Sequence, residues 1–230
     1  MNRRPIITID GPAGAGKSTI SKILAERLSF ICLDTGALYR AVAYRLKSEG
    51  WNGKTETVGD SCRNLKITLQ RNEAGRVRVI VEGEDVSEKI RTEEIGILAS
   101  RISALPQIRE GLFAIQREFA AAGGIVAEGR DMGTVVFPDA EVKFFLDASL
   151  EERAKRRYSE MVSKGERVNL SEIENDIRLR DRQDRGRSIA PLVIPADAVV
   201  VDSSNQSIPQ VVDFMISVIE RDCPLRKCSK

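Results

Sequence analysis

The sequence contains no histidine among its 230 residues, and its four cysteines, Cys32, Cys62, Cys223 and Cys228, form no closely spaced C-x-x-C pair. Zinc sites in proteins are built mainly from these two residue types, so we expect no protein-bound zinc. The unpaired cysteine pattern also favours a reducing compartment, and we expect a cytoplasmic protein.

Long apolar runs are missing as well. No stretch reaches the roughly 18 consecutive apolar residues that a membrane-spanning helix needs, so we expect no membrane segment. The first residues lead directly into a short strand that ends at Asp10, rather than into a cleavable apolar segment. This start predicts a chain that is not exported.

Neither charge nor aromatic content favours a nucleic-acid partner. Lysine and arginine total 36, aspartate and glutamate total 34, and aromatic residues make up 5% of the chain. Proteins that coat nucleic acid usually carry a cationic excess and aromatic side chains for base stacking. We therefore expect no nucleic-acid partner, and any anion-binding site must be local.

The apolar residues follow helical and strand periods in turn, which predicts an α/β fold with a parallel core in one domain. Leu65, Ile67 and Leu69 alternate with polar residues, as do Val77, Val79 and Val81, so an antiparallel hairpin with a turn at 72–75 is predicted within this core. The other predicted strands are 6–9, 30–34, 124–127, 142–147 and 198–201. The predicted helices are 20–28, 37–46, 208–219 and 95–121, the last with a break at Pro106. Two further helices are predicted to open with the Ser-x-x-Glu capping boxes of Ser149 and Ser171.

Residues 11–18, GPAGAGKS, fit the phosphate-binding pattern G-x-x-x-x-G-K-[ST] between a predicted strand and a predicted helix. Glycines let successive backbone N–H groups turn toward one anion, and the helix N-terminus adds partial positive charge. Lys17 can reach the β- and γ-phosphates, and Ser18 can hold Mg²⁺ bound with ATP. The predicted ATP-binding residues are Gly11, Pro12, Ala13, Gly14, Ala15, Gly16, Lys17, Ser18 and Thr19.

A phosphate loop alone does not separate a switch, a motor and a small-molecule kinase. The guanine-specific patterns [NT]-K-x-D and D-x-x-G do not occur in the chain, which argues against a GTPase. Further polar clusters occur in LDTGALYR, in AEGRDMGTVVFPDA and in RLRDRQDRGRSIAPL. Because the carboxyl ends of parallel strands line the ligand crevice of such a sheet, we expect the first two clusters beside the phosphate loop.

With these segments, the chain resembles the bacterial cytidylate kinase family nearly from end to end. The segments IDGPAGAGKST, LDTGALYRAVA, VEGEDVSEKIRTEEI, EGRDMGTVVFPDAEVKFFLDAS and RDRQDRGRSIAPL occur in the family's order and spacing. The resemblance implies a P-loop NTPase fold of three layers with a central parallel sheet, and transfer of the γ-phosphoryl group of ATP to CMP or dCMP. It divides residues 1–230 into a core (1–60 and 100–230), an acceptor-binding β insert (61–99) and a helical lid (about 149–187), and makes a monomer the default.

The resemblance also implies roles for individual residues. Arg40, Arg130 and Arg187 would bind the acceptor phosphate, and Lys17, Arg130 and Arg157 would act on the transferring group. The implied CMP-binding residues are Thr35, Tyr39, Arg40, Ser100, Arg109, Arg130, Asp131, Arg180, Asp184 and Arg187. Among them Ser100, Arg109 and Asp131 would read cytosine, and Arg180 and Asp184 would contact the sugar.

Plainer alternatives stay open for several of these residues. The Arg/Asp alternation from Arg178 to Arg187 is also typical of an exposed, salt-bridged helix face. Arg153, Arg156 and Arg157 rank lower, because they fit surface charge equally well. Glu128 stands where the family more often has aspartate, so its role toward Mg²⁺ is open.

Rival functions also stay open. The same core suits a kinase for UMP, AMP or another small hydroxyl acceptor. A phosphate loop binds nucleotide whether or not transfer follows, so a regulatory nucleotide-binding module and a nucleic-acid-dependent ATPase are the alternatives outside this class.

Overall fold

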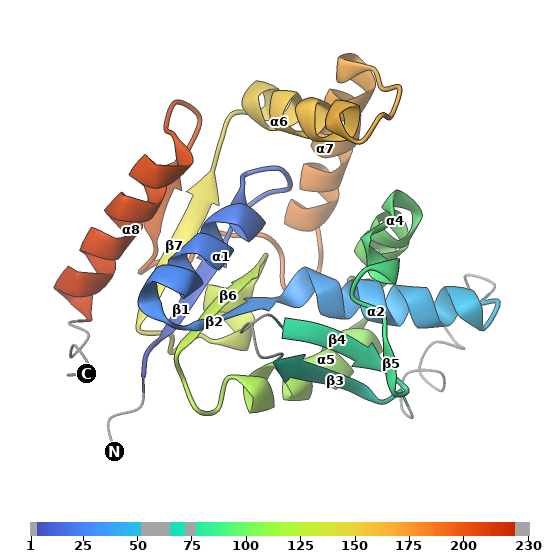
Figure 1. Cartoon of the computed structure of the whole chain (residues 1–230), viewed down its shortest axis with the longest axis horizontal. Coiled ribbons are helices and arrows are strands. Elements are labelled where there is room, and N and C mark those ends of the chain that lie inside the picture. The colour runs from blue at the N-terminus through green and yellow to red at the C-terminus, as the bar shows by residue number, and fades with distance from the viewer. Residues whose placement is uncertain (1–3, 52–64, 72–76, 224–230) are drawn as a thin grey trace.

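A parallel five-stranded sheet forms the centre of the protein (Figure 1). The computed structural model describes residues 4–51, 65–71 and 77–223. The strand order is β2-β6-β1-β7-β8. The strands are β1 (Ile6–Asp10), β2 (Ile31–Asp34), β6 (Ile125–Gly129), β7 (Val142–Asp147) and β8 (Val199–Asp202).

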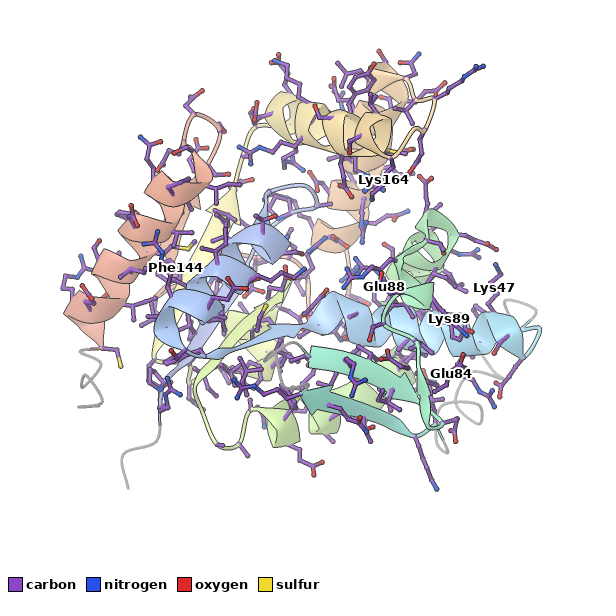
Figure 2. All side chains as sticks on the ribbon, in the orientation of Figure 1. Lys47, Glu84, Glu88, Lys89, Phe144 and Lys164 are labelled. Atoms are coloured by element: carbon purple, nitrogen blue, oxygen red, sulfur yellow. The ribbon has the colours of Figure 1, made fainter. Side chains whose placement is uncertain are left out.

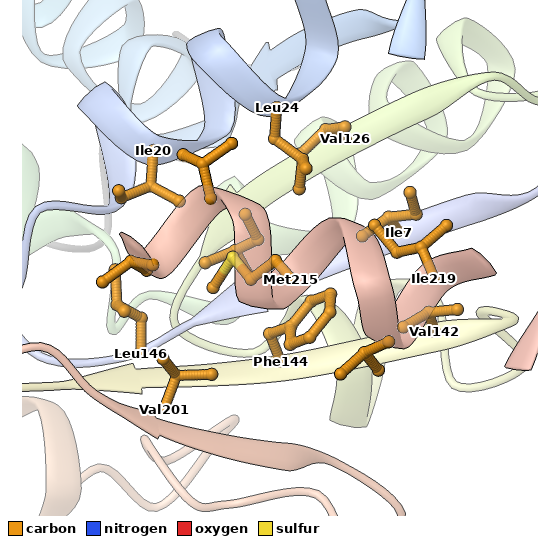
Figure 3. Packing of buried hydrophobic residues seen from close by; sticks show 14 of the residues in the cluster. Ile7, Ile20, Leu24, Val126, Val142, Phe144, Leu146, Val201, Met215 and Ile219 are labelled. Carbon is orange, nitrogen blue, oxygen red and sulfur yellow. The ribbon is translucent and has the colours of Figure 1, made fainter. Parts of the chain in front are cut away.

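Helices cover both faces of this sheet, which confirms the predicted three-layer α/β architecture. Helices α1 (Lys17–Leu28) and α8 (Ile208–Asp222) cover one face, where Ile7, Leu24, Phe144 and Met215 share one buried cluster (Figure 3). Ile6 belongs to a second cluster on the opposite face, with side chains from α5 (Pro106–Phe119) and the short π-helical turn η3 (Met132–Val136). Because side chains alternate across a strand, apolar runs such as IITI can fill both layers.

A second, antiparallel sheet packs beside the core, in the lower right of Figure 1. It contains β3 (Ile67–Arg71), β4 (Val77–Val81) and the two-residue β5 (Glu84–Asp85), in that order. The predicted hairpin strands are confirmed, the predicted turn at 72–75 lies outside the described residues, and β5 was not predicted. The turn η2 (Lys89–Arg91) follows, and its Lys89 donates to Glu84 across the edge of the sheet (Figure 2).

Apolar side chains join this small sheet to three helices. Val79 and Val81 share a buried cluster with residues of α2 (Thr35–Ser48), α4 (Glu93–Ile102) and α5. Pro106 separates α4 from α5 and occupies the first turn of α5, where its missing N–H costs no helical hydrogen bond. The predicted break in the helical periodicity at Pro106 is therefore confirmed.

Helices α6 (Leu150–Ser163) and α7 (Leu170–Arg185) pack against each other at the top of Figure 1. Their apolar contacts form a separate small cluster of Ala154, Met161, Ile173 and Ile177. This pair therefore has an apolar core of its own, apart from the two layers on the central sheet.

The two predicted N-caps of this pair have different outcomes. Ser149 caps α6, since its Oγ accepts from the Glu152 backbone N–H at 3.2 Å. The prediction for Ser171 is wrong, because α7 begins two residues earlier. There the Asn169 side chain is the cap and accepts from the Ser171 N–H at 2.8 Å. Asparagine and serine are both favoured N-cap residues, so the local pattern alone does not choose between them.

No helix in the described part of the chain is long and apolar enough to cross a membrane. Helix α7, for example, is amphipathic: Ile173 and Ile177 are buried, while most of its charged residues are exposed.

The assignment of the α7 cap predicts a difference between two alanine variants. Asn169→Ala removes the side-chain acceptor and should lower the free energy of unfolding by about 1 kcal/mol. Ser171→Ala is the matched control and should have a much smaller effect, because its side chain does not cap the helix. Urea denaturation of both variants measures the difference, and a larger loss for Ser171→Ala would contradict the assignment.

Candidate active site

The register of the central sheet brings two loops together. Asp10, the last residue of β1, pairs with Gly129 at the end of β6 and with Phe145 near the end of β7. The chain continues from β1 into the phosphate loop and from β6 into Arg130. Because the three strands are parallel, the two loops start side by side at one edge of the sheet, as the sequence predicts.

The phosphate loop approaches the neighbouring backbone so closely that glycine is required. A Cβ atom on Gly11 would lie 2.0 Å from the carbonyl oxygen of Leu146, and Gly14 has a φ of +78°. Gly16 stands at the N-cap of α1 and provides no side-chain cap. The N–H groups at the start of α1 are therefore available to an anion, and the helix dipole favours one there.

Lys17 is the first residue of α1, and its side chain points back into the phosphate loop. Its Nζ donates to the carbonyl oxygen of Pro12 at 2.6 Å, and its side chain is buried. Burial lowers the pKa of Lys17 well below its usual value, and the positive charge of Arg130 lowers it further. The positive charge of Arg130 is therefore close enough to act on the Lys17 side chain.

Ser18 and Glu128 connect the loop to the end of β6. The Ser18 hydroxyl donates to Glu128 Oε2 at 2.9 Å, while the buried Oε1 atom has no hydrogen-bond partner among the described residues. Burial raises the pKa of Glu128 to about 7, and the nearby charge of Asp34 adds to the rise. The positive charges of Lys17 and Arg130 oppose this rise.

These residues fit a magnesium ion that is bound mainly through a nucleotide. The described residues contain no group of three or more metal-ligating side chains. Mg²⁺ in phosphate sites usually takes only one or two protein oxygens and completes its shell with phosphates and water. The Ser18 hydroxyl and the unpartnered Glu128 oxygen supply such a pair.

Three of the predicted acceptor residues form two ion pairs with one another. Arg130 Nε donates to Asp184 Oδ2 at 2.7 Å, and Arg187 pairs with the other carboxylate oxygen of Asp184. The Asp184 side chain is only 2% exposed, which rules out the alternative of an exposed, salt-bridged helix face at this position. Burial alone would raise the pKa of Asp184, but Arg130 and Arg187 hold it below its usual value.

Arg180 and Arg40 extend the positive charge of this cluster. The buried Arg180 Nε has no hydrogen-bond partner among the described residues. Burial lowers the pKa of Arg180 to about 10, and the charge of Arg130 contributes to this shift. Arg40 is less buried and lies 3.9 Å from Asp34. An anion bound among these guanidinium groups would relieve their mutual repulsion.

Two of the three predicted cytosine readers, Arg109 and Asp131, are in direct contact. Arg109 pairs with Asp131 through Oδ2 and donates to the Ser103 carbonyl at 3.2 Å. The guanidinium carbon of Arg109 lies 5.8 Å from the centroid of the Tyr39 ring. The buried hydroxyl of Ser100, on α4, has no hydrogen-bond partner in the described part of the protein. Burial raises the pKa of Asp131, and Arg109 opposes that rise.

Thr35 has a different place from the other predicted acceptor residues. Its hydroxyl donates to the Glu128 carbonyl at 2.7 Å, and its side chain is buried. Thr35 therefore fixes the start of α2 against the end of β6, one residue before Gly129.

The arginines of α6 do not follow the predicted ranking. Arg157, the predicted catalytic residue, is 37% exposed and pairs with Glu160 at 3.0 Å. Surface charge is the open alternative for all three arginines, but Arg153 is only 7% exposed and donates to the Ala13 carbonyl of the phosphate loop at 3.0 Å. Arg156 contacts the Ala15 carbonyl at 3.5 Å. The surface reading is therefore wrong for Arg153.

Asp10 is a site residue that the sequence reasoning missed. Its two carboxylate oxygens accept from the backbone N–H groups of Met132 and Gly133 at 2.8 and 2.7 Å. Burial raises the pKa of Asp10 to about 6, although these two hydrogen bonds oppose the rise. Asp10 thereby fixes the π-helical turn η3 that follows Arg130 and Asp131. A carboxylate between the first strand and the phosphate loop could have marked Asp10 as a site residue. Its partners could not be read from the sequence, because they lie more than a hundred residues away.

Comparison with known proteins extends these observations. A family model described as cytidylate kinase matches residues 7–221. A cytidylate kinase of Marinomonas sp. (strain MWYL1) is 49% identical over 218 residues, which is 94% of this chain and 96% of that protein. One of Citrifermentans bemidjiense is 50% identical over 216 residues, with 94% and 92% covered.

Among solved structures, a shikimate kinase from Bacteroides thetaiotaomicron aligns with 94% of this chain and 98% of its own, at 15% identity and a TM-score of 0.47. This likeness is too distant to support an argument about the present site.

The parallel sheet, the phosphate loop after β1 and the arginine cluster after β6 define a P-loop kinase. The family match covers most of the chain and includes every residue of this site. The chain belongs to the cytidylate kinase family.

The central ion pairs predict a pH-dependent loss in one variant. Asp184→Asn should lower the free energy of unfolding at neutral pH by about 3 kcal/mol, because Arg130 and Arg187 lose their buried counter-ion. Since the pKa of Asp184 is lowered from 3.8, its stabilisation is present above that pH and is lost as the pH falls through the lowered value. The difference from wild type should therefore shrink below about pH 4.

Urea denaturation between neutral pH and acid measures this difference. Asp222→Asn is the matched control, since it removes the carboxylate from an exposed pair with Arg221 and should leave stability unchanged. A loss for Asp184→Asn that is equally large in acid would contradict the role of the charge.

Proposed function

We propose that this protein transfers the γ-phosphoryl group of ATP to CMP or dCMP in a magnesium-dependent reaction that yields ADP and CDP or dCDP. The observation that carries the proposal is the buried cationic cluster that shares one electrostatic environment with the phosphate loop. Asp10 at the end of β1 pairs with Gly129 at the end of β6, so the phosphate loop and Arg130 start side by side, and Arg130 donates to the buried Asp184 at 2.7 Å. Such a cluster is stabilised by anionic ligands bound from two sides.

The donor side follows from the phosphate loop. Gly11 to Thr19 would hold the triphosphate of ATP through backbone N–H groups and Lys17. Ser18 and Glu128 would hold Mg²⁺, which supplies charge neutralisation on the phosphate oxygens. The hydrogen bond between these two side chains supports their assignment to one ion.

The acceptor phosphate would bind to Arg130 and Arg187, with Arg40 completing the set. Guanidinium groups match phosphate oxygens in bidentate geometry, and Asp184 already holds the first two in fixed positions. When phosphate binds to these guanidinium groups, their ion pairs with Asp184 would weaken. Asp184 and Arg180 would then be available to the hydroxyl groups of the sugar.

The base would lie between α2, α4 and the turn η3. Asp131 accepts from Arg109 through Oδ2, which leaves Oδ1 for the exocyclic amine of cytosine. The Ser100 hydroxyl offers a further polar contact, and Tyr39 provides an aromatic wall. Uracil carries a carbonyl where cytosine carries the amine, so it would face the carboxylate with an acceptor.

The chemical step needs positioning and charge neutralisation. An oxygen of the acceptor phosphate attacks the γ-phosphorus, the bond from that phosphorus to the β–γ bridging oxygen breaks, and ADP leaves with the electron pair. Lys17 and Arg130 stabilise the charge on the transferring group. This route requires no histidine and no covalent intermediate on the protein.

Two parts of the chain would close over the substrates. The α6–α7 pair, within the proposed lid at about 149–187, has its own apolar cluster and reaches the rest of the protein here through polar contacts such as Arg153 to Ala13. Closure would exclude water and bring Arg157 toward the transferring group. The insert at 61–99 would approach from the acceptor side. We propose that this enzyme works as a monomer in the cytoplasm.

A panel of nucleoside monophosphates tests the reaction directly. Coupled measurement of ADP formation from ATP should show rapid turnover with CMP or dCMP. Lys17→Ala should lower kcat by at least about 100-fold with the fold retained, because a cation at the transferring phosphoryl group is lost. Turnover that depends on AMP, on RNA or DNA, or on no acceptor would favour the rival functions.

The proposed base contacts predict selectivity against UMP. Wild type should favour CMP over UMP in kcat/KM by at least about 100-fold, since a site built around a hydrogen bond rejects an analogue that lacks it. Asp131→Ala should reduce this ratio sharply. The ratio is measured on one enzyme preparation, so partial loss of folded protein cancels. Equal preference in wild type and variant would show that Asp131 does not read the base.

A further inference from the structure

Two carbonyl groups of the phosphate loop are held from the outside by arginines of α6. Arg153 Nη1 donates to the Ala13 oxygen at 3.0 Å, and Arg156 Nη1 lies 3.5 Å from the Ala15 oxygen. The Ser203 hydroxyl, after β8, lies 3.3 Å from the Ala15 oxygen and 3.0 Å from the Asp147 carbonyl oxygen, to either of which it can donate. These contacts are made to the backbone of the loop.

The geometry of the peptide bond gives these contacts a consequence for anion binding. In a planar trans peptide, the C=O of one residue and the N–H of the next point in opposite directions. When Arg153 fixes the Ala13 carbonyl, it also fixes the direction of the Gly14 N–H, on the other side of the loop. The Ala15 contacts fix the Gly16 N–H in the same way. Both glycines would otherwise turn freely.

Arg153 is itself held in place by the surrounding structure. Its Nε donates to the Ala148 carbonyl at 2.9 Å, and a Cβ atom on Gly14 would lie only 3.1 Å from the Arg153 Cβ. Its Nη1 atom lies 2.7 Å from Asp181 Oδ2, in an ion pair whose side chains are 7% and 15% exposed. One guanidinium group thus joins the segment after β7, the phosphate loop and α7.

Asp181 depends on this contact more than a surface carboxylate would. Its other oxygen, Oδ1, is buried and has no hydrogen-bond partner among the described residues. Asp181 lies one helical turn before Asp184, which pairs with the acceptor-side arginines. The two carboxylates of α7 therefore serve two different groups of arginine residues.

We propose that Asp181 and Arg153 are positioning residues of the donor site. Asp181 orients the Arg153 guanidinium, and Arg153 holds the Ala13–Gly14 peptide so that the Gly14 N–H faces the bound triphosphate. The pair acts on phosphate affinity through the backbone of the loop. The inference rests on the proposed function in naming ATP as the ligand.

The test compares nucleotide binding and kinetics in Asp181→Asn with the full-length wild type. Removing the charge weakens the contact that orients Arg153, so the Kd of a non-hydrolysable MgATP analogue and the KM for ATP should rise about tenfold. The Kd of CMP and kcat should change by less than about twofold, because the contacts of Arg130 and Arg187 remain. A purely structural role would lower the thermal stability without separating the two substrates in this way.

Glu174→Gln is the matched control on the same helix. Its carboxylate pairs with Arg178 at 2.7 Å on the exposed side of α7, and its loss should leave both affinities unchanged. If Asp181→Asn does not fold, Arg153→Lys decides the question. Lysine keeps the charge opposite Asp181, but one ammonium group cannot also serve Ala148 and Ala13, so donor binding alone should weaken.

An unchanged Kd for the ATP analogue in the variant that folds would overturn the inference. Tighter binding would overturn it as well, because it would mean that Asp181 restrains Arg153 from contacting phosphate directly. The Kd of the non-hydrolysable analogue, measured by calorimetry, does not depend on turnover. A wild type that binds ATP but does not phosphorylate CMP would therefore count against the proposed function, while the donor affinities of the variants would still decide the role of Asp181.

Discussion

The parallel pairing of β1 with β6 and β7 is the constraint on which the site depends. Asp10 is hydrogen-bonded into the same edge of the sheet as Gly129 and Phe145, so the next residues of all three strands begin side by side. One of these continuations is a glycine loop that binds anions, and another begins with Arg130. The carboxylate of Asp10 then fixes the turn after Arg130 through two backbone N–H groups. A single strand end therefore sets the positions of both halves of the site.

Buried ion pairs hold the remaining charged groups ready for anions. Pairs of this kind contribute little net stability, because each group loses hydration when it is buried. They do fix the positions of side chains, and Asp184 fixes two guanidinium groups at once. The same helix presents Asp181 to Arg153, one turn earlier. Helix α7 is thus attached to both sides of the site by charge, while its apolar contacts are mostly with α6. Ion pairs of this kind can be exchanged for contacts with bound phosphates, as the proposed closure of the α6–α7 pair requires.

Much of the fold could be predicted because its signals are local. Apolar runs, alternating residues and Pro106 identified the strands, the β3–β4 pair and the separation of α4 from α5. The phosphate loop was predictable for the same reason, since strand, glycines, Lys17 and Ser18 follow one another directly. The two-residue strand β5 gave no period to detect. The cap of α7 was misplaced because Asn169 and Ser171 offer equivalent chemistry within one turn.

The parts of the site that were missed depend on packing between distant segments. Arg153, Arg156 and Arg157 lie within five positions on one helix, and only the orientation of α6 against the phosphate loop makes Arg153 buried and Arg157 exposed. The partners of Asp10 likewise come from η3, far along the chain. The individual roles of the acceptor residues came from the family resemblance, because a pattern of alternating arginine and aspartate does not reveal which face of α7 is buried.

The proposed reaction requires that a triphosphate site and a monophosphate site face each other across a single crevice. The most direct measurement is calorimetric binding of a bisubstrate ligand in which adenosine and cytidine are joined by a chain of five phosphates. Two sites that face each other should bind this ligand at least about 100-fold more tightly than ATP or CMP alone, because the second contact becomes intramolecular. An affinity no better than that of ATP would show that the two sites are not opposed, and would contradict the account.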